Sequence, residues 1–362
     1  MQQMSAGIQW YFELLDQARR RHGIAMEHLG YVPNETESEV ALSMPGLRLR
    51  RFSGNHTSRD IALIVPAPIK QAYIWDLAPE RSVVRDALNN GLQVYLIEWT
   101  EPGKAEAGFG LEHYGYRLLD ACVDTIEREN SRHHDTCISL LSHSLGGVLA
   151  AIYAAMRPER VASLVLVEAP LKFAGCTGAF GPLLAAGPRA HTMTAEFDRV
   201  PGTILNLASM LAAPSTFGAE RYADLLACMG SSEDLRTHFL VERWTLDEAP
   251  MSTALFQDVI ERLYHGDAFM CGTLEIDGHR LAPAAVVCPI YAVYDPRSRI
   301  IPSISVTGFV EATSSSDRRF YVYQGDTGVA LAHVGALVGE SAHSKLWPEI
   351  LAWLPKAHGS TH

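Results

Sequence analysis

The chain has 362 residues, of which 48% are hydrophobic and 20% are charged, and this composition excludes a globally disordered protein. The formal net charge of −11 argues against a broad surface for nucleic acid or anionic membranes. The sequence contains no apolar run of about 18 residues, so no transmembrane helix is expected. The N-terminal segment lacks an apolar signal core, which predicts a cytoplasmic protein. The six cysteines form no CxxC pair, so neither a disulfide framework nor a metal site is expected.

Residues 7–29 have the apolar spacing of an amphipathic helix. Short apolar runs and helical stretches then alternate along the chain. The predicted strands are 47–53, 61–65, 93–97, 137–141 and 163–167, and the predicted helices are 82–89, 111–129 and 145–156. This alternation predicts βαβ units and a parallel sheet that is buried on both faces.

The strand rhythm stops near residue 172, resumes at 289–294 and 320–323, and is followed by a helix over 345–354. The interval reads as helical and irregular, with many Leu, Met, Phe and Ala residues, so we expect a cap that leaves a restricted, apolar route to the site. The predicted organisation is an N-terminal helical extension (1–50), an α/β core (51–171 and 288–362) and a cap, or lid, subdomain (172–287).

The strongest local motif is Ser-His-Ser-Leu-Gly-Gly at residues 142–147, between the strand 137–141 and the helix 145–156. A strand-to-helix turn of small residues is typical of the nucleophile elbow of the α/β-hydrolase fold. Ser144 is the predicted nucleophile, and Ser142 occupies a position where Gly is usual. The alternative interpretation is a helix N-cap serine followed by close-packing glycines.

A serine nucleophile needs a base and a carboxylate that orients the base, and in this fold the chain order is Ser, acid, His. His333 follows the last predicted strand and is the predicted base. Asp295 directly follows the strand 289–294 and is the predicted acid, with Asp326 as the alternative. Each residue also has an ordinary interpretation, His333 as a packed or surface histidine and Asp295 as a turn former before Pro296.

The oxyanion hole should use the backbone N–H of Leu145 and a second N–H from the turn after the strand 61–65. Pro66 and Pro68 in this turn have no N–H, so Ala67 or Ile69 must supply it. His143 lies beside the nucleophile in sequence but points elsewhere on an elbow. We expect it to line the cleft.

Several of these segments together resemble the polyhydroxyalkanoate synthase family. Residues 64–77 (IVPAPIKQAYIWDL) are similar to the family motif V-P-P-x-I-N-K-x-Y-I-x-D-L, and residues 79–85 and 91–99 are similar to the patterns that follow it. Trp244 and Asp247 resemble a W-x-x-D element, and residues 333–339 resemble H-x-G-x-x-V-G. The resemblance covers about residues 60–355 and implies an α/β-hydrolase fold, a mostly parallel doubly wound sheet with an inserted helical cap, and Trp244 lining the cleft.

This sequence departs from the family pattern at three places. The family nucleophile is Cys, whereas position 144 is Ser. Counting back from Pro302 places Ser298, rather than Asp295, at the position of the family acid. Pro68 and Lys70 replace residues of the motif on the oxyanion side.

The resemblance implies an acyltransferase that moves a (hydroxy)acyl group from a thioester, through acyl-Ser144, to an alcohol or amine. One alternative is a serine esterase, thioesterase or polyester hydrolase with the same triad, and a second is a non-catalytic granule- or partner-binding module. No cofactor is expected, and acyl-coenzyme A or an acyl carrier protein would serve as the donor substrate. The smaller synthases work with a second subunit, so the resemblance also implies a homodimer or such a partner.

Overall fold

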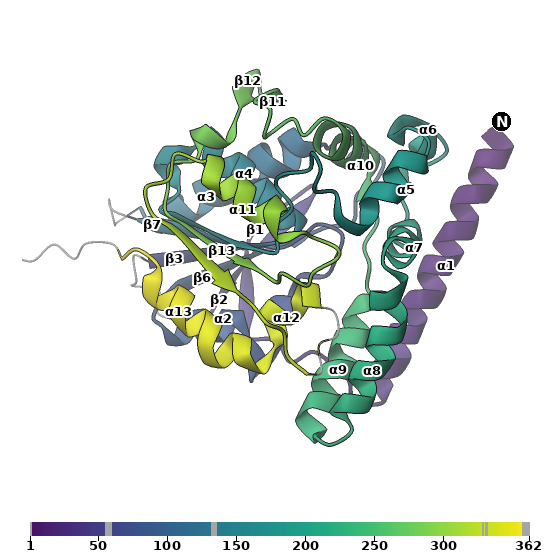
Figure 1. Ribbon diagram of the computed structural model, residues 1–362, viewed down its shortest axis with the longest axis horizontal. Coiled ribbons are helices and arrows are strands. Elements are labelled where there is room, and N and C mark those ends of the chain that lie inside the picture. The colour runs from purple at the N-terminus through teal and green to yellow at the C-terminus, as the bar shows by residue number, and fades with distance from the viewer. Residues whose placement is uncertain (1, 55–59, 132–135, 328, 330–331, 357–362) are drawn as a thin grey trace, which may run out of the picture.

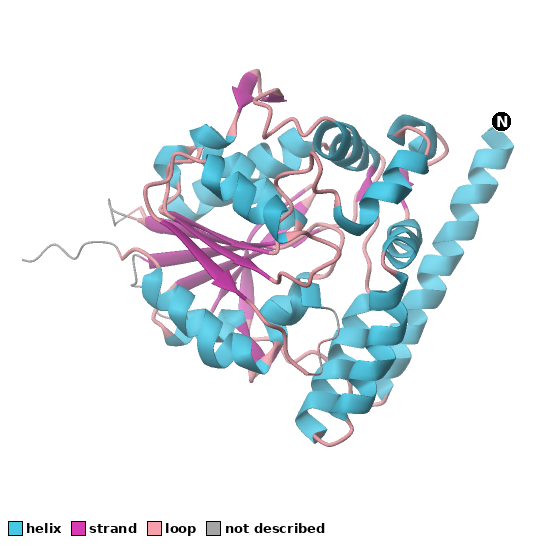
Figure 2. Cartoon of the chain, in the orientation of Figure 1, coloured by secondary structure: helices cyan, strands magenta, loops and turns pink. Residues whose placement is uncertain are grey.

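The computed structural model describes residues 2–54, 60–131, 136–327, 329 and 332–356. A central sheet forms the middle layer, and helices cover both of its faces (Figure 2). The order of its eight strands is β1-β2-β6-β3-β7-β8-β13-β14. The six neighbouring strands β6, β3, β7, β8, β13 and β14 are parallel to one another, whereas β2 is antiparallel to both β1 and β6. The predicted mostly parallel sheet is therefore confirmed.

The bounds of the strands follow from short, mostly apolar runs between turns. The sheet consists of β1 (Ser38–Met44), β2 (Leu47–Phe52), β3 (Asp60–Val65), β6 (Gln93–Trp99), β7 (Cys137–His143), β8 (Ser163–Val167), β13 (Ile290–Tyr294) and β14 (Arg318–Val322). Small two-stranded sheets pair β4 (Asp76–Ala78) with β5 (Arg81–Ser82), β9 (Arg199–Val200) with β10 (Met251–Ser252), and β11 (Leu274–Ile276) with β12 (His279–Leu281). The central sheet begins at Ser38, within the segment 1–50 that the sequence assigned to an extension.

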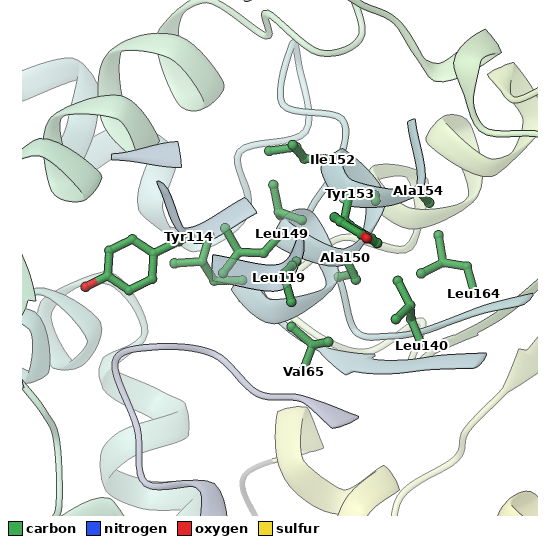
Figure 3. Packing of buried hydrophobic residues seen from close by; sticks show 14 of the residues in the cluster. Val65, Tyr114, Leu119, Leu140, Leu149, Ala150, Ile152, Tyr153, Ala154 and Leu164 are labelled. Carbon is green, nitrogen blue, oxygen red and sulfur yellow. The ribbon is translucent and has the colours of Figure 1, made fainter. Parts of the chain in front are cut away.

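The helices fall into two layers and a cap (Figure 1). One face of the sheet carries α3 (Leu118–Glu129), α4 (Leu145–Met156) and α11 (Ser303–Ala312), and the other carries α2 (Val83–Asn89), α12 (Ala332–Val338) and α13 (Trp347–Trp353). Each layer has its own hydrophobic core. Helix α4 lies at the centre of the first core, where its side chains are packed on all sides (Figure 3). This burial fixes the helix that begins directly after Ser144.

The segment between β8 and β13 forms the predicted cap. Its helices are α5 (Gly181–Ala186), α6 (Ala190–Thr194), α7 (Gly202–Ala212), α8 (Arg221–Cys228), α9 (Ser232–Thr245) and α10 (Thr253–Gln257). The N-terminal helix α1 (Gln2–His28) packs against α7 and α9 of the cap (Figure 1). Within the described ranges, no helix is both long and apolar enough to cross a membrane, and a cytoplasmic location stays a prediction.

Asp16 joins α1 to the cap at the start of α7. Its carboxylate accepts hydrogen bonds from the backbone N–H groups of Gly202 (3.2 Å) and Thr203 (2.7 Å). The first N–H groups of a helix have no partner within the helix, so this carboxylate acts as an N-cap supplied by another helix. Arg19 continues the contact and donates to the carbonyls of Leu246 and Glu248. Helix α1 is therefore an integral part of the cap layer.

Candidate active site

The chain reverses its direction of winding at β3, because β6 pairs with one edge of β3 and β7 pairs with the other. Crevices at the carboxyl ends of strands next to such a switch point are the usual ligand sites of open α/β sheets. Here the turn after β3 carries Ala67 and Ile69, and the turn after β7 carries Ser144. The topology therefore brings the predicted nucleophile and the predicted oxyanion turn to one edge of the sheet.

Ser144 occupies a strained backbone conformation between β7 and α4. Its φ of 55° and ψ of −131° lie outside the regions that non-glycine residues normally adopt. Two backbone hydrogen bonds hold the turn, from the Ser144 N–H to the Val167 carbonyl (3.0 Å) and from the Gly147 N–H to the Ser144 carbonyl (2.9 Å). This geometry is that of a nucleophile elbow, and it differs from an ordinary N-cap, because the Ser144 side chain accepts no capping hydrogen bond.

The small residues around Ser144 are required by close backbone contacts. A Cβ atom on Gly146 would lie 2.1 Å from the carbonyl oxygen of Val65 and 2.6 Å from that of Pro66. Ser142 is tolerated in place of the usual Gly because its hydroxyl donates to the Val165 carbonyl at 2.6 Å. The end of β3 therefore presses directly against the elbow.

The backbone N–H groups predicted for the oxyanion hole lie at this contact. Leu145 is the first residue of α4, so its N–H has no partner within the helix. Across the described residues, no acceptor is recorded for the N–H of Ala67 or Ile69 either. Trp99 anchors the turn by donating from its indole N–H to the Pro66 carbonyl at 2.8 Å. Ala67 and Ile69 therefore both remain candidates for the second donor, and the oxyanion hole stays a prediction.

His333, at the start of α12, contacts His143, the residue that precedes the nucleophile. The Nε2 atom of His143 lies 2.7 Å from the His333 carbonyl oxygen, and the two ring centroids are 4.5 Å apart. A carbonyl can only accept, so His143 donates from Nε2. No hydrogen bond between the Ser144 hydroxyl and His333 is recorded among the described residues, and catalytic hydrogen bonds are often loose before substrate binds.

Burial sets the charge of these two histidines. It lowers the pKa of His333 to about 4, and it lowers the pKa of His143 well below the usual range. Both imidazoles are therefore neutral near pH 7. A neutral imidazole can accept a proton, as a general base must.

The recorded hydrogen bonds of the two predicted acids are with residues other than His333. Asp295 is fully buried, and its carboxylate accepts hydrogen bonds from the Arg297 backbone N–H at 2.8 Å and from the Arg297 guanidinium at 2.7 and 3.0 Å. Asp326 accepts from the Tyr323 hydroxyl at 2.5 Å and from the Ser341 hydroxyl at 2.7 Å. The assignment of Asp295 or Asp326 to the triad stays a prediction.

The carboxylate recorded nearest His333 belongs to a residue that the sequence reasoning missed. Oε2 of Glu168 lies 3.8 Å from Nδ1 of His333. Glu168 directly follows β8 and is 1% exposed, and burial raises its pKa to about 8. An acidic residue directly after an apolar strand, between Ser144 and His333 in the chain, was a signal that could have found it.

A pocket opens beside His333. It has an empty volume of about 310 Å³, open solvent included, and lies between the cap and the loop after β13. Its lining residues are Thr216, Glu220, Arg297, Ser298, Arg299, Ile300 and His333. Most of them are polar, so this pocket differs from the apolar route that the composition of the cap predicted.

His143 and Trp244, the two residues expected to line the cleft, are 4% and 5% exposed and do not line this pocket. The indole N–H of Trp244 donates to the Gln71 carbonyl at 2.8 Å, and its ring faces the Lys70 ammonium at 5.0 Å. Trp244 thus braces the segment that follows the oxyanion turn. Their role in the cleft stays a prediction.

One cluster of metal-ligating residues occurs in the described part of the chain, on the α8–α9 hairpin of the cap. The ligand atoms of Asp224, Cys228 and His238 lie within 4.8 Å of one another. His238 and Asp224 are hydrogen-bonded at 3.0 Å, and burial raises the pKa of the Cys228 thiol to about 11.

Comparison with known proteins agrees with this fold. A family model described as "alpha/beta hydrolase fold" matches residues 74–213. The "Poly(3-hydroxyalkanoate) polymerase subunit PhaC" of Haloferax mediterranei is 30% identical over 324 residues, which cover 88% of this chain and 64% of that protein. The subunit of the same name from Allochromatium vinosum is 24% identical over 81% of this chain and 79% of its own length.

The chain spans less than two thirds of the Haloferax relative and 60% of the Haloarcula marismortui subunit of the same name. Among solved structures, the match to the Paleococcus ferrophilus monoacylglycerol lipase covers 85% of this chain and 98% of the lipase chain, with a TM-score of 0.52 and 16% identity. At that identity the likeness shows the fold alone. The α/β-hydrolase fold and the resemblance to the polyhydroxyalkanoate synthases are confirmed.

Proposed function

The chain is a relative of the polyhydroxyalkanoate polymerase subunits with the α/β-hydrolase fold, and from this premise we propose that it is a serine-nucleophile acyltransferase. The acyl group would come from a thioester, carried by coenzyme A or a carrier protein, and would pass through acyl-Ser144 to an alcohol or amine. The observation that carries the proposal is Ser144, held at φ 55° on a tight strand-to-helix turn, with its neighbour His143 in contact with His333.

The proposed chemistry has two steps. The Ser144 hydroxyl attacks the acyl carbonyl carbon while its proton passes to Nε2 of His333, the ring nitrogen that does not face Glu168. The thioester bond breaks, and the sulfur leaves as a thiol with that proton. An acceptor O–H or N–H then attacks the acyl-serine, its proton passes to His333, and the proton returns to the Ser144 oxygen.

Serine in place of cysteine changes the energetics of this cycle. A cysteine would exchange one thioester for another with little change in free energy, whereas a serine converts the thioester into an oxygen ester, which is downhill. The hydroxyl is barely ionised and depends on its base, so His333 is essential in the proposal. Polymer synthesis is one case of transfer to an alcohol acceptor.

Hydrolysis is the second candidate function, and the polar lining of the pocket beside His333 favours it. The pocket is open to solvent and has Thr216, Ser298 and two arginines on its walls. Water that reaches His333 there would compete with an acceptor for the acyl-serine. The same triad would then act as an esterase or thioesterase.

Turnover measurements separate these outcomes. Butyryl-coenzyme A would be supplied with water alone, with an alcohol and with an amine, and thiol release and acylated product would be quantified. Ser144→Ala and His333→Ala should each reduce thiol release by several orders of magnitude. Retention of the wild-type rate in either variant would overturn the proposal, and product formed only with water would favour the hydrolase.

A further inference from the structure

Both of the predicted triad acids have their carboxylates occupied. Asp295 uses both oxygens on Arg297, through the backbone N–H, Nε and Nη2 of that residue. Asp326 uses its carboxylate on Tyr323 and on the backbone and hydroxyl of Ser341. For the residues that the structure describes, no contact between either carboxylate and the His333 ring is recorded.

Glu168 presents a free carboxylate oxygen to His333 instead. Its Oε1 accepts a hydrogen bond from the Asp295 backbone N–H at 2.5 Å, which anchors the side chain. Its Oε2 lies 3.8 Å from Nδ1 of His333. These two atoms are both buried, and neither is hydrogen-bonded within the described chain, although the Ser298 hydroxyl lies close enough to the Glu168 carboxylate to lower its pKa in part. Buried polar atoms are rarely left unpaired, so a buried acceptor and a buried ring nitrogen that face each other form an incomplete hydrogen bond.

The backbone holds Glu168 opposite the elbow. His143 pairs with Val167 in the β7–β8 register, and the Ser144 N–H donates to the Val167 carbonyl. Glu168 comes next, with its own N–H bonded to the Val293 carbonyl of β13 at 2.9 Å and a φ of 47°. A left-handed backbone is uncommon for a non-glycine residue and often marks a functional position. The nucleophile and the carboxylate therefore extend from neighbouring positions of paired strands.

We propose that Glu168, rather than Asp295, is the carboxylate that positions His333 during acyl transfer. The inference rests on the proposed function and names a further member of its site. Glu168 would accept the Nδ1–H of His333, fix the tautomer that leaves Nε2 free to accept the Ser144 proton, and stabilise the imidazolium that results. Closing the 3.8 Å gap to hydrogen-bond distance needs a shift of about 1 Å, within the loosening seen in unliganded sites.

The charged groups around Glu168 predict how its ionisation follows pH. Asp295 is a neighbouring carboxylate, neutralised by Arg297, while His333 and, behind it, His143 are neutral imidazoles near pH 7. Burial is the main reason that the pKa of Glu168 rises to about 8. The ionised carboxylate stabilises the imidazolium better than the neutral acid does. Activity should therefore rise with pH across this range.

The experiment compares kcat/KM for p-nitrophenyl butyrate between pH 6 and 9.5 in the wild type, Glu168→Gln and Asp295→Asn. Glu168→Gln should be at least 100-fold slower at pH 8.5 and should lose the rise near pH 8, whereas Asp295→Asn should keep that rise. Glu248→Gln is the matched control, since Glu248 is also a buried glutamate with an unpaired oxygen, and it should keep the rise as well. Loss of the rise in Asp295→Asn with its retention in Glu168→Gln would overturn the inference.

A second readout does not depend on turnover. In protein labelled with ¹⁵N-histidine, the Nδ1 resonance of His333 should shift in the wild type as Glu168 ionises near pH 8, and this shift should vanish in Glu168→Gln. An Nδ1 resonance that is insensitive to pH between 7 and 9 in the wild type would overturn the inference, even if Glu168→Gln failed to fold. A wild type with this shift but no acyl turnover on any donor would refute the proposed function alone.

Discussion

At the scale of single residues, the elbow depends on Gly146 as much as on Ser144. Three atoms of the β3 turn would lie between 2.1 and 2.6 Å from a Cβ at position 146, and all three belong to backbone. Backbone cannot move aside as the end of a flexible side chain can, so the turn and the strand must separate. The strained Ser144 conformation persists only while that packing holds.

Gly146→Ala should therefore destabilise the fold by about 3 kcal/mol, at the upper end of ordinary overpacking costs, and should abolish activity. Chemical denaturation measures the change in the free energy of unfolding. Gly218→Ala is the control, because a Cβ at Gly218 meets nothing within 4 Å, and its stability should stay within about 0.5 kcal/mol of the wild type. Equal stability of the two variants would show that the elbow is not packed against β3 in this way.

The shifted pKa of Glu168 makes a second residue-scale prediction, on stability. In the folded protein this pKa is about 8 against an ordinary 4.5, so the folded state binds the proton more tightly than the unfolded state does. The contribution of Glu168 is complete below pH 4.5 and is lost as the pH rises through 8. His333 acts in the opposite direction, because its pKa falls from 6.5 to about 4, and stability is lost as the pH falls through that interval.

Between pH 6.5 and 8 only the Glu168 effect operates within this pair. The free energy of unfolding should fall with pH by up to about 1.4 kcal/mol per unit in the wild type, and less steeply in Glu168→Gln, which resembles the protonated acid at every pH. Urea denaturation at several pH values in this window measures both slopes. Parallel slopes would contradict a raised pKa at Glu168.

At the scale of elements, most strands and helices could be predicted from the sequence. The runs at 137–141, 163–167 and 289–294 match β7, β8 and β13 to within one residue at the strand start, because central parallel strands are apolar on both faces and are bounded by turns. β1 was missed, since it lies at the edge of the sheet and its residues are half-buried or exposed. Its residues form no continuous apolar run, in contrast to the run at 320–323 that marks the other edge strand, β14.

The junction of α1 and the cap is an element-scale feature that no local pattern predicts. Asp16 reads as one acidic residue in an amphipathic helix, yet it is 7% exposed and caps α7 from 186 residues away. Such a contact depends on which helices become neighbours. Sequence periodicity does not contain that information.

Asp16→Ala should cost about 1 to 2 kcal/mol, the usual effect of removing an N-cap, and should loosen the cap before the core. Thermal unfolding together with limited proteolysis measures both effects, with early cleavage expected near α7. Asp16→Asn keeps an oxygen for the Thr203 N–H and should lose less stability. A cap that resists protease in Asp16→Ala as well as in the wild type would contradict this role.

At the scale of the whole molecule, the sequence predicts which residues follow the strands of the sheet, but not which of those residues contact one another. Ser144 and His333 are predicted site residues because each follows a recognisable strand, and the sheet brings both to one edge. The contacts between His143 and the His333 carbonyl, and between Glu168 and the His333 ring, join segments about 165 to 190 residues apart. They depend on the strand order, which local patterns do not determine.

Intact-protein mass spectrometry tests the central claim most directly. The protein would be incubated with a panel of acyl-coenzyme A thioesters and then analysed whole and as peptides. We expect a wild-type adduct of one acyl group on Ser144, no adduct in Ser144→Ala, and formation slowed by orders of magnitude in His333→Ala. An adduct that forms equally well in both variants, or that maps to another residue, would contradict acyl transfer through Ser144.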